Sequence, residues 1–146
     1  MFVVRAIALR ILILRTAQFA FFSMLVVLTI LALIDSDIVR PALRWDKAEH
    51  FLAYLFLALI GTIAVPRVPL VVILLALFAQ STVLEAIQPY FGRTRDVGDL
   101  IANAAGIATF AFCYLARSLR KWLIKPQEGD LIIPAELVSH SLMNKR

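Results

Sequence analysis

The chain has 146 residues, of which 62% are apolar, with a mean hydropathy of +0.87 and a formal net charge of +5. The length leaves room for one domain, and the apolar content exceeds the roughly 45–50% typical of soluble domains. These values exclude an ordinary soluble protein. The positive charge is distributed as membrane topology requires, so we do not expect nucleic-acid binding.

Four uncharged stretches follow one another along the chain. They cover residues 16–34, 51–66, 68–84 and 100–116, and they are 19, 16, 17 and 17 residues long. A bilayer core about 30 Å thick needs around 20 helical residues. The second stretch reaches that length if its helix begins at Ala48, with His50 at the interface. We therefore predict an all-α integral membrane protein, a four-helix bundle.

The N-terminus precedes the first stretch as a basic, apolar segment, residues 1–16. Its arginines, Arg5, Arg10 and Arg15, are spaced by five, so they fan around a helix and define no single polar face. We predict a helical extension whose arginines reach the headgroups. A cleaved signal peptide is the alternative, but "LALIDSD" offers no small-residue cleavage site.

The charges on the loops predict the orientation. The N-terminus, the loop at Arg67 and the C-terminal segment together carry ten cations and three acids, whereas the opposite side, the other two loops with the adjoining helix ends, carries five cations and seven acids. Positive flanks stay in the cytoplasm, so both termini are predicted to be cytoplasmic. Residues 17–125 then form the membrane domain and residues 126–146 a cytoplasmic tail. The predicted location is the bacterial cytoplasmic (inner) membrane.

Several kinds of chemistry lack their usual residues. Cys113 is the single cysteine, so one chain forms no disulfide and offers no thiolate cluster to a metal. There is no Gly-x-Ser-x-Gly nucleophile motif and no phosphate-cradling glycine loop. Soluble nucleotide chemistry is therefore not expected.

Three helix ends deliver polar residues to one predicted face, the extracytoplasmic one. Asp46, His50 and Tyr54 are spaced i, i+4 and i+8, so they share one side of a helix. The full set of candidates is Asp46, Lys47, His50, Tyr54, Glu85, Gln88, Arg93, Asp96, Asp99 and Asn103. Glu85 and Asn103 fall below the headgroup level, where polar side chains usually face a bundle interior or a wet cavity.

Small residues accompany these polar groups on the fourth helix. Ala102, Ala105 and Gly106 form a stripe that would let another helix approach closely. We therefore expect the second, third and fourth helices to surround one polar pocket.

The same residues carry a resemblance. Asp-Lys-x-x-His-Phe followed by Tyr, then Glu-x-x-Gln, then Gly-Arg-Thr-x-Asp-x-x-Asp-x-x-Ala-Asn-x-x-Gly resembles the VanZ-like family of small bacterial membrane proteins. The similarity covers about residues 45–112 and departs from the usual pattern at Arg95 and Gly98. It implies a multi-pass membrane protein of the cell envelope, since the namesake is linked to low-level teicoplanin resistance. It implies no established chemical mechanism.

A purely structural network is one interpretation of these residues. Asp46 could pair with Arg93, Glu85 with Lys47 or His50, and Asp99 could cap the fourth helix. Acids are favoured at helix N-termini by about 0.3–1 kcal/mol each without any function.

The functional interpretation is a pocket for an anionic lipid or a lipid-linked cell-wall precursor. Lys47, Arg93 and Arg95 would bind phosphate. In an enzyme, a lipid-headgroup hydrolase or transferase, the acid and base would come from His50, Glu85 and Asp99.

Other possibilities stay open beside that pocket. The chain could be a small transporter or flippase component, or form a homo-oligomer. No cofactor is expected, and a metal is possible but not favoured because this face offers only one histidine.

Overall fold

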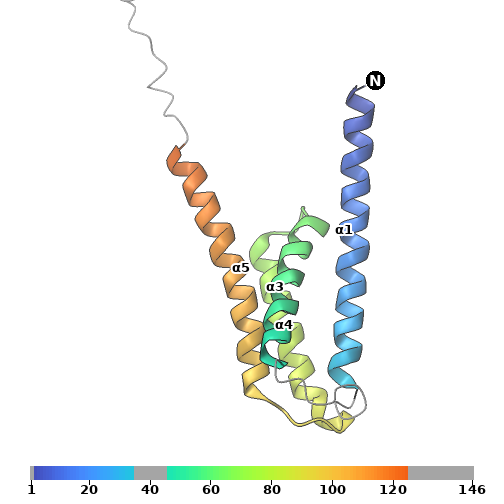
Figure 1. Ribbon diagram of the computed structural model, residues 1–146, viewed down its shortest axis with the longest axis vertical. Helices are drawn as coiled ribbons and strands as arrows, with labels where there is room; N and C mark the ends of the chain where they lie inside the picture. Colours follow the sequence, from blue (N-terminus) through green and yellow to red (C-terminus); the bar gives the residue numbers. More distant parts are fainter. Residues whose placement is uncertain (1, 35–45, 125–146) are drawn as a thin grey trace, which may run out of the picture. The chain divides into compact units, whose positions relative to one another are not determined.

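Four long helices make up most of the part of the chain that the structure describes. The computed structural model describes residues 2–34 and 46–124, and for residues 2, 3 and 46 the backbone alone. The helices are α1 (Phe2–Leu33), α3 (Asp46–Ala64), α4 (Leu70–Ile87) and α5 (Val97–Ile124), with the short 3₁₀ helix η1 (Gln88–Phe91) after α4 (Figure 1). The described residues contain no strand. The predicted all-helical class is confirmed.

Each of these four helices is long and apolar enough to cross a membrane. At 1.5 Å per residue, the 32 residues of α1 extend for about 48 Å. Large apolar side chains remain exposed along the helices, among them Phe19 at 77% and Leu75 at 62%. A soluble protein would bury such residues, whereas lipid tails accept them. The chain is a multi-pass membrane protein.

Three of the described helices, α1, α3 and α5, begin earlier than the uncharged stretches, whereas α4 begins two residues after the start of its stretch. The helix α1 includes the arginine-bearing N-terminus, so the predicted helical extension is confirmed. The helix α3 begins at Asp46, two residues before the expected Ala48, which places Lys47 and His50 inside its first turns. The prolines in "VPRVP" mark the turn to α4, where the Val68 N–H donates to the Val65 carbonyl at 3.0 Å.

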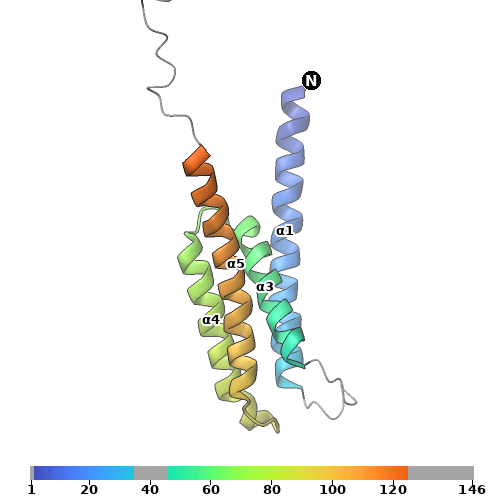
Figure 2. The ribbon, with the colours of Figure 1, turned by 60° about the vertical axis from the view of Figure 1, so that its left-hand side comes forward.

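The chain divides into two compact units, residues 1–113 and 114–146. Within the first unit, α1 ends, α3 begins, α4 ends and α5 begins at the same end of the bundle, and Figures 1 and 2 both show these ends together. We call this the polar end. Of the second unit the structure describes residues 114–124, the last turns of α5. The predicted tail, 126–146, lies outside the described residues.

An apolar core holds the first unit together away from the polar end. All four helices contribute to it, with buried residues that include Phe21, Leu57, Ala58, Ile73, Leu77 and Ile107. Gly61 lies so close to α1 that an added Cβ would stand 2.8 Å from Phe21 Cε2. Small residues thus bring the helices within packing distance where lipid supplies no hydrophobic drive for association.

The helices α3 and α5 approach each other closely at Gly106. A Cβ there would overlap the Phe51 carbonyl oxygen and stand 3.0 Å from the Leu55 nitrogen. These are backbone atoms, so no side-chain movement would relieve the overlap. Of the predicted small-residue stripe, Gly106 makes this contact, whereas Ala105 is exposed.

Candidate functional site

The antiparallel arrangement explains why residues distant in sequence meet at the polar end. The helices α3 and α5 begin there, whereas α1 and α4 end there. Side chains in the first turns of α3 and α5 therefore face side chains in the last turns of α1 and α4. The contacts form two layers, an ion cluster near the helix ends and a cavity beneath it.

The ion cluster joins the starts of α3 and α5. Lys47 on α3 forms salt bridges with both Asp96 and Asp99, and Asp99 is buried. Asp96 also caps α5, since its carboxylate accepts a 2.7 Å hydrogen bond from the Gly98 N–H. The hydrogen bond from Lys47, followed by that from Gly98, holds the pKa of Asp96 below its ordinary value. The cluster thus fixes α3 against α5 at the site.

His50 lies one turn deeper on α3 and contacts α5 through both ring nitrogens. Its Nδ1 lies 3.1 Å from Asn103 Oδ1, and its Nε2 lies 3.4 Å from Asp99 Oδ2. An amide oxygen only accepts hydrogen bonds, so a hydrogen bond at this contact requires the tautomer with a hydrogen on Nδ1. Asn103 is 2% exposed. Asn103 therefore faces the bundle interior, as predicted.

A second chain of hydrogen bonds closes the site toward the core. The Tyr54 hydroxyl donates to Gln80 Oε1 at 2.6 Å, and Gln80 Nε2 donates to Thr29 Oγ1 at 3.4 Å. This chain links α3, α4 and α1 one turn above the apolar core. Because each partner is satisfied by another, the three helices have a defined register at this level.

Arg93 and Gln88 bind the end of α1. Arg93 Nη1 donates to the carbonyls of Leu31 at 3.3 Å and Ala32 at 3.0 Å, and Gln88 Nε2 donates to the Ala32 carbonyl at 3.3 Å. The last carbonyls of a helix lack intrahelical partners and carry its partial negative charge. The Arg93 guanidinium and the Gln88 amide therefore cap the C-terminal end of α1. Arg95, by contrast, donates to the Ala86 carbonyl at 2.8 Å on an exposed surface.

Glu85 is the buried carboxylate of α4, with 8% of its surface exposed. Its Oε2 accepts a 3.4 Å hydrogen bond from the Asp96 N–H. Among residues 2–34 and 46–124, the Asp96 N–H is the one donor to the Glu85 carboxylate. The other oxygen, Oε1, accepts no hydrogen bond from these residues. A buried carboxylate with so few partners is costly unless a ligand or water completes it.

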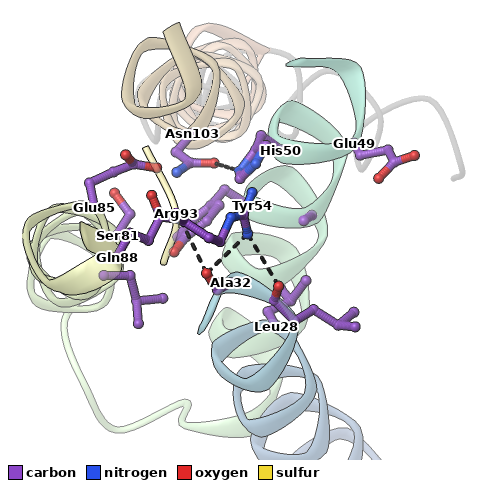
Figure 3. A pocket seen from close by; sticks show the side chains of 13 residues that line it. Leu28, Ala32, Glu49, His50, Tyr54, Ser81, Glu85, Gln88, Arg93 and Asn103 are labelled. Carbon is purple, nitrogen blue, oxygen red and sulfur yellow. Dashed lines mark hydrogen bonds between the residues drawn. The ribbon is translucent and has the colours of Figure 1, made fainter. Parts of the chain in front are cut away.

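These residues surround a partly open cavity of about 150 Å³ (Figure 3). Its lining comes from the four long helices, η1 and the loop after η1: Leu28, Leu31, Ala32, Glu49, His50, Ala53, Tyr54, Ser81, Leu84, Glu85, Gln88, Arg93 and Asn103. In Figure 3, Ser81 and Glu85 of α4 and Gln88, the first residue of η1, lie across the cavity from His50. The space accommodates several water molecules or one small polar group.

The sequence candidates divide between the two layers. The cavity is lined by six of them, His50, Tyr54, Glu85, Gln88, Arg93 and Asn103. The ion cluster holds Lys47, Asp96 and Asp99. The side chain of Asp46, and with it the suggested pair with Arg93, lies outside the described residues. Lys47 pairs with the two aspartates, whereas Glu85 accepts from the Asp96 backbone.

Three polar features of the lining were not among the candidates: Glu49, Ser81 and the backbone carbonyls at the end of α1. Ser81, 1% exposed, lies one turn before Glu85 on α4, and that i, i+4 spacing could have pointed to it. The carbonyls of Leu31 and Ala32 could not be found from sequence, because any residue supplies a backbone oxygen. Within the described ranges, no group of three or more His, Cys, Asp or Glu side chains is arranged to hold a metal ion.

The chain matches no family model, no curated protein sequence and no solved structure. The interpretation of the site therefore depends on its own geometry.

Proposed function

We propose that this multi-pass protein binds the headgroup of an anionic lipid or of a lipid-linked cell-envelope intermediate, at the extracytoplasmic leaflet of a bacterial cytoplasmic membrane. The observation that supports the proposal is the cavity at the polar end, where polar side chains from α3, α4 and α5 meet beside the end of α1. Polar groups at such a depth are expensive and typically serve a ligand or a pathway. The resemblance to VanZ-like proteins supports a role in the cell envelope.

Binding is favoured over catalysis by the contacts of His50. A general base needs a nitrogen within reach of the proton that it removes. Both ring nitrogens of His50 contact oxygen atoms of α5, Asn103 Oδ1 and Asp99 Oδ2. The imidazole therefore acts as a connector between α3 and α5 beside the ligand.

Transport through one copy is disfavoured by the core beneath the cavity. Below Tyr54 and Gln80, the buried residues Leu57, Leu77 and Ile107 form an apolar layer. A polar headgroup crossing this layer would lose its hydrogen bonds, at several kcal/mol per group. The cavity is thus better suited to hold a headgroup than to pass it on.

The test fills the cavity. Ser81→Leu puts an apolar side chain into the cavity wall, and Thr82→Leu makes a similar change at the next position, which is exposed. Each variant and the parent chain are purified from native membranes in a mild detergent, and their bound lipids are identified by mass spectrometry. We expect the parent chain and Thr82→Leu to retain the same enriched lipid, and Ser81→Leu to lose it.

The structural-network alternative makes the opposite prediction. If the polar end serves folding alone, the parent chain and Ser81→Leu carry the same bulk lipids in the same proportions. That result would remove the binding proposal, provided that both proteins accumulate in the membrane to similar levels.

A further inference from the structure

The hydrogen-bonding groups of the cavity are not equally available to a ligand. Most donors are used inside the protein. Tyr54 donates to Gln80, Ser81 donates to the Phe78 carbonyl at 3.1 Å, and Gln88 Nε2 donates to the end of α1. Arg93 Nη1 is shared between two α1 carbonyls. The donors with remaining capacity are the other N–H groups of Arg93 and the Asn103 amide nitrogen.

The acceptor oxygens on α4 and at the start of η1, by contrast, remain available to a ligand. Within the described part of the chain, Glu85 Oε1 and the side-chain oxygen of Gln88 accept no hydrogen bond. The Ser81 oxygen donates its hydrogen but keeps lone pairs that can accept. Ser81 and Glu85 lie at positions i and i+4 of α4, Gln88 follows at i+7 as the first residue of η1, and all three line the cavity. This side of the cavity, which we call the α4 wall, therefore offers oxygen atoms that lack donors.

The charges around the cavity point the same way. The charged groups that face the cavity are the carboxylate of Glu85 and the guanidinium of Arg93, whereas the Glu49 side chain points away from it (Figure 3). The charge of Arg93 is partly offset by the negative end of the α1 dipole, which its Nη1 contacts. Lys47 does not line the cavity and is paired with two aspartates. A phosphate inside the cavity would be repelled by Glu85, and repulsion is strong at low dielectric.

We infer that the group entering this cavity is a protonated primary amine, which the α4 wall binds through Glu85, Gln88 and Ser81. A primary ammonium has three N–H donors and one positive charge. The three acceptors of the wall match the donors, and the Glu85 carboxylate matches the charge. The inference depends on the proposed headgroup-binding function and specifies its ligand as an amine-bearing headgroup, whether the whole lipid is anionic or zwitterionic: the amine enters the cavity, and the phosphate stays outside it.

The experiment compares headgroups that differ in this property. The full chain is placed in nanodiscs containing phosphatidylethanolamine, phosphatidylcholine or phosphatidylglycerol, and retained lipid is counted by native mass spectrometry. Phosphatidylcholine keeps the positive charge but has no N–H donor, and phosphatidylglycerol has hydroxyl donors but no positive charge. A second arm uses a polyprenyl diphosphate-linked amino sugar and its N-acetylated form. We expect the free amine to be retained at least about tenfold better in one arm or both.

Glu85→Gln tests the contribution of the charge. Glutamine keeps an acceptor oxygen and nearly the same shape but removes the charge, so the preference for the free amine should fall about tenfold. Thr82→Leu, on the exposed side of α4, should leave the preference unchanged. A preference in one arm alone identifies the source of the amine.

Two results would overturn the inference: equal retention of amine and non-amine headgroups in both arms, or an amine preference that Glu85→Gln leaves intact. Neither would by itself remove the headgroup-binding function, because Ser81→Leu tests occupancy of the cavity whatever the ligand's charge. If Ser81→Leu alters no bound lipid, the function itself fails.

Discussion

At Gly106 the backbones of α3 and α5 come so close that no side chain fits between them. The contact lies one turn from Asn103 on α5, and it faces Phe51, the neighbour of His50 on α3. The spacing that brings His50 to Asn103 therefore depends on a missing Cβ.

Gly106→Val should destabilise the protein by about 1–3 kcal/mol, because the overlap is with backbone and the two helices must separate. Ala105→Val, on the exposed side of the same turn, should change stability little. Reversible unfolding in mixed micelles measures both. Equal stabilities for the two variants would contradict the close approach.

The two aspartates of the ion cluster, Asp96 and Asp99, lie three residues apart and both pair with Lys47, but their side chains differ in burial. The side chain of Asp99 is 5% exposed and contacts both Lys47 and His50, whereas that of Asp96 is 50% exposed. Asp99→Asn should therefore cost about 2 kcal/mol of stability. Asp96→Asn should cost clearly less, because asparagine still caps a helix and the lost ion pair is exposed. A larger loss for Asp96→Asn would contradict this assignment.

Asp96 should also contribute a small pH dependence. Its pKa is lowered from 3.8, first by Lys47 and then by the Gly98 N–H, so it stabilises the folded state above that value. The contribution is lost as the pH falls from 3.8 through the lower folded pKa. The stability difference between the parent chain and Asp96→Asn should be constant near neutral pH and shrink below pH 3.8. A difference that grows on acidification would contradict the direction.

At the scale of elements, the C-terminal end of α1 is held by residues about 60 positions later in the sequence, in η1 and the loop after it. Arg93 and Gln88 satisfy the Leu31 and Ala32 carbonyls, and the same two carbonyl-bearing residues form one wall of the cavity. The cavity thus needs α1 to end where Arg93 can reach it.

Arg93→Gln should loosen the last turn of α1, at about 1 kcal/mol, because two terminal carbonyls lose a charged donor. Hydrogen exchange at the amides of residues 31–34 should accelerate. Arg95→Gln removes an exposed arginine that donates to the Ala86 carbonyl on α4 and not to α1. It should therefore leave the exchange of residues 31–34 unchanged. Equal acceleration in both variants would indicate a general charge effect.

At the scale of the whole molecule, the four helices predict a topology that labelling can test. Thr94 lies at the polar end and Arg67 lies in the turn between α3 and α4, and both are exposed. In a Cys113→Ala background, we expect Thr94→Cys in intact cells to react with a membrane-impermeant maleimide and Arg67→Cys to react only after lysis. Reaction of both from the same side would contradict the crossing of α3 and α4.

Much of the architecture follows from the sequence alone. Four uncharged runs separated by charged loops allow few arrangements in a bilayer, because each backbone polar group needs an intrahelical partner there. The same physics indicated that Glu85 and Asn103 face inward, since lipid gives them no hydrogen bonds. Six of the ten candidates do line one cavity, and three more form the adjacent ion cluster.

Only the tertiary structure decided which polar groups partner one another. Residue spacing does not reveal that Lys47 pairs with Asp96 and Asp99. Nor does it reveal that Arg93 donates to the carbonyls of α1. Several pairings have similar energies, and the choice depends on helix ends brought together by packing, with Gly106 setting the distance. Some of the partners are backbone oxygens, such as those that Arg93 contacts, and these cannot be identified from the sequence because every residue carries one.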